Sequence, residues 1–338
     1  MKEKAEDQKS RGKDKRNTII ISVLIISTAI FIGIGIYSYL LLNKVKKTEL
    51  PKDNVSLGIN KEVVQQLKQQ DPKQDVVNIA LFGLDRRSKD DASRSDAIMV
   101  VSIDNRYKKI KLSSVMRDTY VEVPDYGMTK ITHAYAYGGP KLAVKTLNLN
   151  FNLNIKDYVT VDFFGLEKII DLLGGVVIDI RKEEIPEING NMLDVAYIEK
   201  ENIPTVTNYG RVSLNGIQAV AYSRIRHIGN DFERTDRQSK VLTEMLNKIQ
   251  VKGITKYPSI VSTLLPYVET SISNEDILSI GASILSWGTK TIDRERFPID
   301  GYWHDSMIGG DYYLSADLKA TTDQIYKYIY EDVKPVEK

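Results

Sequence analysis

The chain has 338 residues, 42% hydrophobic and 27% charged, which suits one large folded domain with additional segments. It has no cysteine, which excludes disulfides, thiolate catalysis and cysteine-ligated metal sites. Residues 60–338 contain 36 Lys/Arg and 39 Asp/Glu, and this slightly acidic balance disfavours nonspecific binding of nucleic acid.

Residues 18–42 form a run of 25 residues without a charged side chain. As a helix this run spans about 37 Å, enough to cross a hydrocarbon core of about 30 Å. The alternative is a cleaved signal peptide, but such a peptide has an apolar region of about 7–15 residues and a small-residue cleavage site. Here the run is longer and no such site follows it. We therefore predict an uncleaved membrane anchor.

The basic residues on either side of this run predict its orientation. Residues 1–17 contain seven Lys/Arg, and residues 43–59 contain four. Positive charge favours the cytoplasmic side, so we expect a single-pass protein of the cell membrane with residues 1–17 in the cytoplasm. Residues 43–75, which include Pro51 and Pro72, are predicted to be an extracellular stalk that acts as a plain spacer, with a possible short helix over 63–70. Residues 76–338 would form the extracellular domain.

Apolar runs and helical periodicity predict the elements of this domain in chain order. Strands are expected at residues 78–84, 97–103, 110–114 and 120–123, followed by helices at 140–149 and 163–173 and a strand at 176–180. Further helices are expected at 215–222, 232–249, 258–268, 276–287 and 316–330. Strands interleaved with helices indicate an α/β sandwich.

Common catalytic signatures are absent: the sequence has no P-loop, no G-x-S-x-G, no H-E-x-x-H and no G-x-G-x-x-G. A nucleotide cofactor is therefore not expected.

Instead, arginines and carboxylates cluster at the ends of predicted strands, in the segments GLDRR, RSDA and SSVMRDT, and most densely over residues 222–238. That last segment contains four arginines and no lysine. A guanidinium group is a planar fork that matches phosphate oxygens two at a time, so the clusters favour phosphate binding. An ion-pair lattice with Asp231, Glu233 and Asp236 is the competing interpretation.

The helix expected at 232–249 places Arg234, Arg237 and Gln238 within one arc of about 100°, and Val241 and Met245 continue that arc. This face is cationic where the helix begins and apolar further on, which resembles the polarity of a lipid pyrophosphate. Packing of the apolar part against the core is the alternative.

Asp85 and Asp96 are candidate magnesium ligands, because Mg²⁺ is commonly held by one or two carboxylates plus phosphate oxygens. They could equally orient neighbouring arginines.

At these residues the sequence resembles the LytR–CpsA–Psr family, over roughly residues 77–250. The matching segments are LFGLD, RSDAIMV, SSVMRDTYVEVP, KITHAYAYGGP, DYVTVDFFGLEKIIDLLGGV, LNGIQAVAYSRIRH and DFERTDRQ. Two positions depart from the usual pattern: Met116 stands where the family usually has proline, and Asn230 where glycine is common. Neither departure removes a charged group.

The resemblance implies an α/β/α sandwich with a mixed central sheet and a hydrophobic tunnel for a polyprenyl chain. It implies an enzyme that transfers a glycopolymer, such as wall teichoic acid or capsule, from undecaprenyl pyrophosphate to peptidoglycan, with Mg²⁺ as cofactor. The residues implied to bind pyrophosphate are Arg94, Arg117, Arg224, Arg226, Arg234, Arg237 and Gln238, with Asp85 and Asp96 beside the metal. Catalytic roles fall to Asp96, Arg117 and Arg226, and the tunnel candidates are Val161, Phe163, Leu166, Ile169, Val241 and Met245, which could also be ordinary core.

Three other functions remain open at this point. A hydrolase would use the same residues with water in place of the sugar hydroxyl. A non-enzymatic regulator that binds lipid phosphates would need an output domain, and none is recognisable in residues 1–17. A surface protein that binds DNA is disfavoured by the acidic balance of the domain.

Overall fold

The computed structural model describes residues 46–73, 75–85, 94–199, 204–253, 256–288 and 291–338. The predicted cytoplasmic segment and membrane anchor, residues 1–42, lie outside these residues. No helix within the described ranges is both long enough and apolar enough to span a membrane.

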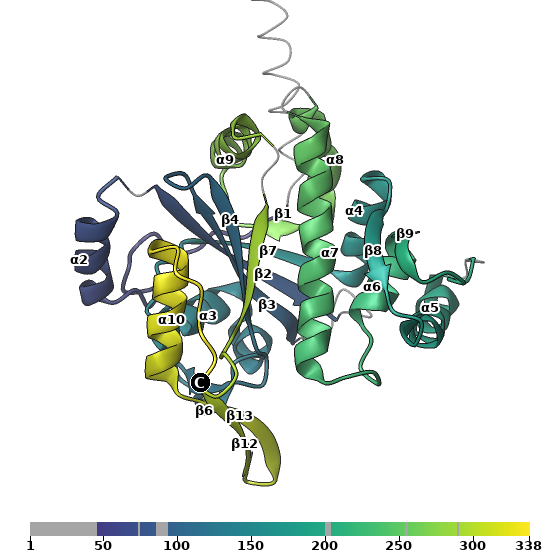
Figure 1. The fold of residues 1–338 in the computed structure, drawn as a ribbon. Helices are drawn as coiled ribbons and strands as arrows, with labels where there is room; N and C mark the ends of the chain where they lie inside the picture. The colour runs from purple at the N-terminus through teal and green to yellow at the C-terminus, as the bar shows by residue number, and fades with distance from the viewer. Residues whose placement is uncertain (1–45, 74, 86–93, 200–203, 254–255, 289–290) are drawn as a thin grey trace, which may run out of the picture. The chain divides into compact units, whose positions relative to one another are not determined.

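A seven-stranded sheet forms the centre of the domain, in the order β1-β10-β7-β2-β3-β4-β11 (Figure 1). Its strands are β1 (Lys46–Lys47), β10 (Glu269–Thr270), β7 (Asp157–Asp162), β2 (Val76–Leu84), β3 (Ser95–Asp104), β4 (Lys109–Val115) and β11 (Ile292–Phe297). β2 is parallel to β7 and β4 is parallel to β11, whereas β3 is antiparallel to both β2 and β4. The expected mixed sheet is therefore confirmed.

Helices cover both faces of this sheet. Successive side chains of a strand point to opposite faces. In β2, Ala80 and Phe82 pack in a core cluster with side chains of α2 (Lys61–Gln70), α3 (His133–Phe151) and α10 (Leu318–Tyr330). Ile79, on the opposite face, packs with side chains of α9 (Asn274–Ser286). A second large cluster is built by α4 (Phe163–Leu172), α5 (Glu184–Glu199), α6 (Gly216–Ser223), α7 (Asp231–Lys252) and α8 (Tyr257–Leu264), which is followed by the short helix η1 (Leu265–Tyr267).

Small two-stranded sheets complete the domain. They pair β5 (Tyr120–Val123) with β6 (Gly127–Lys130), β8 (Val176–Ile180) with β9 (Gly210–Leu214), and β12 (Trp303–Ile308) with β13 (Asp311–Ala316). The strands and helices predicted from the sequence are present, with two adjustments. α3 begins before Pro140, but Gly138 and Gly139 interrupt it with non-helical backbone angles. α10 begins at Leu318, because the preceding residues belong to β13.

The segment predicted to be a plain spacer packs onto the domain. Leu57, Ile59, Val63 and Leu67 are buried in the main core cluster, and the Asn148 side chain donates a hydrogen bond to the Leu57 carbonyl oxygen at 2.8 Å. Residues 45–338 accordingly form one compact unit. The prediction of a stalk over 43–75 is therefore wrong for residues 57–67, although the short helix expected at 63–70 is confirmed as part of α2.

This packing predicts a measurable contribution to stability. Leu57 is 1% exposed, so Leu57→Ala should lower the free energy of unfolding by about 2–5 kcal/mol through lost burial and a residual cavity. Denaturant titration of the full chain measures the change. Val55→Ala is the matched control, because Val55 is 76% exposed and its truncation should change stability by less than about 0.5 kcal/mol. Equal, small effects of the two substitutions would restore the spacer interpretation.

Candidate active site

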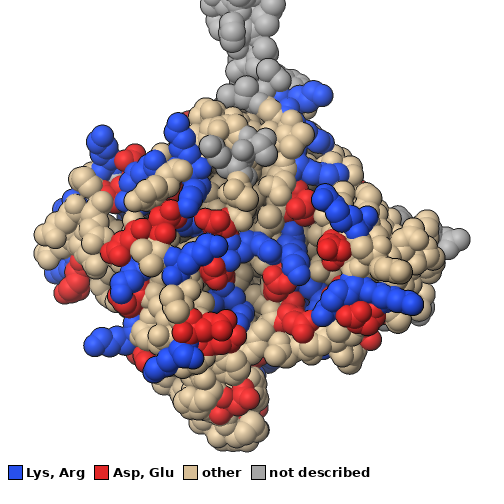
Figure 2. Space-filling model, viewed as in Figure 1, with Lys and Arg blue, Asp and Glu red and all other residues tan. Residues whose placement is uncertain are grey.

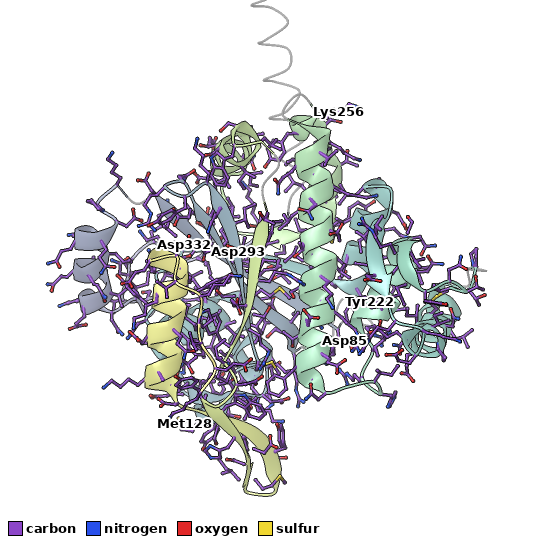
Figure 3. All side chains as sticks on the ribbon, in the orientation of Figure 1. Asp85, Met128, Tyr222, Lys256, Asp293 and Asp332 are labelled. Carbon is purple, nitrogen blue, oxygen red and sulfur yellow. The ribbon has the colours of Figure 1, made fainter. Side chains whose placement is uncertain are left out.

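One edge of the central sheet gathers the charged residues singled out in the sequence. Asp85 follows β2, Asp162 ends β7, and Arg117 comes two residues after β4. These three strands run in the same direction. β3 is antiparallel to them, so it begins at that edge, and Asp96 is its second residue. Asp85 and Asp96 thus lie at the ends of neighbouring strands, and Figure 3 labels Asp85.

A β-bulge sets the direction of Asp96. Gly83 pairs with Ala97 and Leu84 pairs with Ser95, so Asp96 is the extra residue between two pairs. Without the bulge, Asp96 would share the face of Ile98, which lies in the apolar core. With the bulge, Asp96 and Ala97 both line a cavity on the other face. Bulges commonly redirect a side chain in this way beside a functional site.

Asp96 and Asp231 hold a cluster of arginines, which we call the arginine cluster: Arg117, Arg226 and Arg234. Arg117 Nη1 lies 2.5 Å from Asp96 Oδ1, and Arg226 Nη2 lies 3.3 Å from Asp96 Oδ2. Arg117 Nε lies 3.2 Å from Asp231 Oδ2, and Arg234 Nη2 lies 2.9 Å from Asp231 Oδ1. Segments after β4 and α6 and the first turns of α7 therefore meet at one place.

Arg117 and Arg234 have different electrostatic surroundings within the arginine cluster. Burial alone lowers the pKa of Arg117, but the carboxylates of Asp231, Asp96 and Asp118 raise it above its ordinary value. For Arg234, which is 2% exposed, burial lowers the pKa, and the nearby cations Arg117 and Arg226 add to that effect. Arg234 Nε is buried and has no hydrogen-bond partner among the described residues. A buried donor without an acceptor is costly, so phosphate oxygens would stabilise this arrangement.

A mostly apolar cavity of about 230 Å³ adjoins the arginine cluster. Asp96, Asp162, Ser223 and Gln238 form its polar part, and the buried Gln238 Oε1 has no hydrogen-bond partner among the described residues. Its walls come from β2, β3 and β7 on the sheet side and from α4, α7 and α8 on the helix side. The six residues named from the sequence as tunnel candidates all line it: Val161, Phe163, Leu166, Ile169, Val241 and Met245.

The outer face that carries α7 has no uniform charge. Lys/Arg and Asp/Glu side chains are interspersed there (Figure 2), as in the pairs of Asp236 with Lys240 at 2.6 Å and with Arg294 at 3.5 Å. The ion-pair lattice considered from the sequence is therefore present: besides these pairs of Asp236, Glu233 pairs with Arg237 at 3.0 Å and Asp231 pairs with Arg117 and Arg234. The arginine cluster also lies beside an apolar cavity, which is a combination suited to a ligand with a charged head and an apolar tail.

Comparison with known proteins agrees with this geometry. The profile of the LytR_cpsA_psr family matches residues 38–328. The chain belongs to the LytR–CpsA–Psr family.

Individual relatives of this family cover most of the chain. The polyisoprenyl-teichoic acid–peptidoglycan teichoic acid transferase TagT of Bacillus subtilis (strain 168) is 29% identical over 93% of this chain and 94% of that protein. The regulatory protein MsrR of Staphylococcus aureus (strain Mu50) is 35% identical over 70% of this chain and 68% of that protein. A solved structure of TagT with bound octaprenyl pyrophosphate lipid matches 78% of this chain and 92% of its own, with a TM-score of 0.58 and 25% identity. A second solved structure, TagT bound to LI-WTA, also matches 78% of this chain and 92% of its own, with a TM-score of 0.62 and 26% identity.

Within this LytR–CpsA–Psr domain, Arg237 does not have the role predicted for it. Its side chain is 2% exposed, and its Nε donates to Glu184 Oε1 at 2.8 Å. Its Nη1 and Nη2 donate to the carbonyl oxygens of Ile225 at 3.3 Å and Ile228 at 2.9 Å. These contacts contradict direct binding of pyrophosphate by Arg237. Arg237 instead holds the loop that carries Arg226.

The remaining predicted residues occupy the margin of the site. The Arg224 guanidinium lies 5.1 Å from the centre of the Phe163 ring, which lines the cavity. Arg94 is exposed. Burial lowers the pKa of His133, and the positive charge of nearby Arg94 lowers it further. Asp96 clearly orients two arginines, as the alternative to metal binding proposed.

The carboxylates of the site bear on the predicted magnesium ion. The described residues contain no group of three or more His, Asp or Glu side chains placed to hold a metal ion. A magnesium ion that relies on one or two carboxylates and on phosphate oxygens of the ligand does not need such a group. Asp85 and Asp96, at the ends of paired strands, are the carboxylates predicted for such a site, and both oxygens of Asp96 are paired with arginines here.

Sequence reasoning did not find Asp231 as the partner of Arg117, nor Glu184 as the partner of Arg237. Glu184 lies 53 residues before Arg237 and on a different helix, so no spacing rule connects them. Asp231 was noted only as a possible member of a lattice. Its position at the first turn of α7, where a carboxylate is favoured, was the available signal.

Proposed function

We propose that this protein transfers an anionic glycopolymer, such as wall teichoic acid or capsule, from undecaprenyl pyrophosphate to peptidoglycan at the outer face of the cell membrane. The observation that supports it most is the convergence of Arg117, Arg226 and Arg234 beside an apolar cavity. Relatives named teichoic acid transferases, and a relative's structure with a bound prenyl pyrophosphate, support the same activity. Residues 18–42 would anchor the enzyme, with the domain outside.

The pyrophosphate would bind at the arginine cluster. Guanidinium groups donate paired hydrogen bonds to phosphate oxygens, and these bonds are stronger when water is excluded. Arg234 contributes a buried donor that has no protein acceptor, and Gln238 contributes a buried amide beside it. The prenyl chain would extend from there between α4 and α7, along the side chains that line the cavity.

The reaction would be a substitution at phosphorus. A hydroxyl group of the acceptor sugar attacks the phosphorus next to the glycopolymer, a phosphodiester forms, and polyprenyl phosphate leaves. Arg117 and Arg226 would stabilise negative charge that develops on the phosphoryl oxygens, because both are already held in place by Asp96. Asp96 would orient these two arginines, and the proton of the attacking hydroxyl would pass to the departing polyprenyl phosphate. Arg237 would keep the loop bearing Arg226 in position.

Magnesium is the cofactor that we propose for this site, with Asp85 and Asp96 as its protein ligands. When bound, Mg²⁺ would neutralise charge on the pyrophosphate oxygens.

The experiment that tests this function uses the full chain in detergent micelles, with a polymer linked to undecaprenyl pyrophosphate as donor and peptidoglycan as acceptor. Covalent attachment of polymer to peptidoglycan, with release of polyprenyl phosphate, is expected. Free polymer without attachment would instead identify a hydrolase. Donor binding without turnover would favour a regulator, in line with the name of the relative MsrR.

Filling the cavity should block the lipid. Val241 is 2% exposed and lines the cavity wall, so Val241→Trp should raise the dissociation constant for a prenyl pyrophosphate about tenfold or more. Fluorescence titration with an octaprenyl pyrophosphate measures this. Leu193→Trp is the control, because Leu193 is 71% exposed on α5 and its replacement should leave binding unchanged. Unaltered affinity of a well-folded Val241→Trp variant would show that the lipid binds elsewhere.

A further inference from the structure

Exposed aromatic side chains gather beside the sheet edge that carries the arginine cluster. We call this surface the aromatic strip and define it as Tyr126, His133, Tyr137, Tyr312 and Tyr313. Tyr126 is 54% exposed, Tyr137 is 45% exposed and Tyr312 is 40% exposed, which is unusual for large rings. The side chains of the strip come from the turn between β5 and β6, from the start of α3 and from β13. Figure 1 shows the β12–β13 hairpin extending beyond the sheet next to β6, and Figure 3 labels Met128 of β6 in the same region.

The rings of the aromatic strip form an ordered surface. Tyr126 and Tyr137 are stacked with ring centres 4.5 Å apart and an angle of 21° between their planes. His133 lies next to Tyr137 at 5.6 Å. Tyr313 packs edge-on against Tyr120 of β5 at 4.8 Å, and the ammonium group of Lys130 lies 5.6 Å from the Tyr312 ring and 5.7 Å from the Tyr313 ring. Neighbouring rings that hold one another lose little freedom when a ligand binds.

A chain of contacts joins the aromatic strip to the arginine cluster. Lys130 Nζ lies 2.8 Å from Asp118 Oδ1, and Asp118 Oδ2 lies 3.5 Å from Arg117 Nε. The backbone N–H of Leu314, between Tyr313 and the end of β13, donates to the Asp118 carbonyl oxygen at 2.9 Å. Burial, followed by the carboxylates of Asp305, Asp118 and Asp231, raises the pKa of Tyr312. Two of these carboxylates also contact Arg117, so the strip begins where the arginine cluster ends.

We propose that the aromatic strip binds the acceptor, a neutral saccharide chain whose sugar rings stack on Tyr126, Tyr137 and Tyr312 while one hydroxyl reaches the arginine cluster. The C–H face of a sugar ring is weakly positive and fits the negative face of an aromatic ring. Tyrosine and histidine add polar groups at the ring edges, which suits the hydroxyls of a sugar. This inference rests on the proposed function, because it assigns the second substrate of that reaction.

The charge of the strip selects among possible occupants. The β12–β13 hairpin contains Asp305 and Asp311 and no lysine or arginine, and the Lys130 ammonium that contacts Tyr312 and Tyr313 is paired with Asp118 at 2.8 Å. An anionic membrane surface attracts basic segments and repels carboxylates. The same repulsion disfavours the anionic polymer of the donor. A saccharide without dense negative charge is therefore the occupant that the strip fits best.

The test measures binding of chitin oligosaccharides, which are neutral chains of N-acetylglucosamine without the lactyl carboxylates of peptide-free glycan strands, to the full chain in detergent micelles by calorimetry. The Tyr126→Ala/Tyr137→Ala double variant and Tyr312→Ala should each raise the dissociation constant about tenfold. Tyr312→Phe keeps the ring and should retain most of the affinity. Tyr209→Ala is the matched control, since Tyr209 is 66% exposed and precedes β9, and it should bind as the unaltered protein does.

Equal affinity of the alanine variants and the control, or absence of glycan binding by the unaltered protein, would overturn the inference. So would protection of Tyr126, Tyr137 and Tyr312 from nitration by a water-soluble reagent when the full chain is placed in vesicles of phosphatidylglycerol and cardiolipin, because the strip would then be a membrane contact. Binding of octaprenyl pyrophosphate is measured in parallel and should not change. Tyrosine-dependent glycan binding without polymer transfer would support the strip and reject the proposed function.

Discussion

Replacing Asp96 with asparagine is expected to reduce the turnover of polymer transfer by about 10²–10³-fold, the range found when one preorganised electrostatic group is removed from an active site. Asp96 contacts Arg117 and Arg226 through its two oxygens, and it is one of the two proposed magnesium ligands. The asparagine keeps the shape of the side chain but removes the charge that aligns both guanidinium groups. Initial rates at saturating donor, with peptidoglycan as acceptor, measure the effect.

The matched control is Asp236→Asn. Asp236 also pairs with two cations, Lys240 and Arg294, but it is 50% exposed and does not line the cavity. Exposed ion pairs contribute little, so this variant should keep its activity. If Asp96→Asn transferred polymer as fast as Asp236→Asn, the site proposed for the chemistry would be wrong.

Removal of the Glu184 carboxylate should give a large loss of stability. Glu184 is 2% exposed and accepts from Arg237 Nε at 2.8 Å and from Arg181 Nη2 at 3.1 Å. Glu184→Ala would leave the buried Arg237 guanidinium with Glu233, whose side chain is 45% exposed, as its remaining carboxylate partner at 3.0 Å. The cost in the free energy of unfolding should therefore lie near the lower end of the range of about 3–5 kcal/mol for a broken buried ion pair. Transfer should fall as well, because Arg237 holds the loop that carries Arg226. Denaturant titration and rate measurements on the same preparation separate the two effects.

The neighbouring residue supplies the control for this variant. Glu183 pairs with Arg181 at 3.4 Å, but its side chain is 56% exposed, so Glu183→Ala should change stability by less than about 0.5 kcal/mol. In the double variant Glu184→Ala/Arg237→Ala, the loss should be smaller than the sum of the single losses, since each single change leaves a buried charge. Additive losses would show that the two side chains act independently.

The same ion pair predicts a dependence on pH. Burial tends to raise the pKa of Glu184, but hydrogen bonds from the Arg181 backbone and from the Arg237 and Arg181 side chains hold it below its usual value. A lowered pKa in the folded state stabilises the protein above the unfolded pKa of about 4.3, and this contribution is lost as the pH falls through the folded value. The unaltered protein should therefore lose more stability than Glu184→Ala upon acidification below about pH 4.

Several elements could not be predicted because their sequence patterns are weak. β11 (IDRERF) is mostly charged, and it is a strand because its backbone pairs with β4 along one side. An edge strand needs only one partner and tolerates such side chains, so periodicity gives no signal. The buried segment around Leu57 was missed for a related reason. Its apolar residues are few, and their burial depends on α3, which lies some ninety residues later, as in the Asn148 to Leu57 hydrogen bond.

The helical period of α7 was informative but incomplete. The arc that contains Gln238, Val241 and Met245 does line the cavity, as the period indicated. Arg237 lies at the edge of that arc, about 60° from Arg234. Its side chain turns to Glu184 and to two backbone carbonyls instead. A difference of about 60° around the helix is enough to give Arg237 other partners than Arg234. The helical period of the sequence does not show which partners a side chain at the edge of the arc will find.

Residue types and their spacing were enough to predict a mixed α/β domain with arginines and aspartates at strand ends and at the start of a helix, without nucleotide motifs or cysteine. Local patterns suffice for this, because residue type and spacing are carried by short segments. Only the tertiary structure decided which arginines remain available for a ligand. Arg234 and Arg237 are equally buried, yet Arg237 is satisfied by protein acceptors and Arg234 Nε is not, because availability depends on partners that distant segments supply.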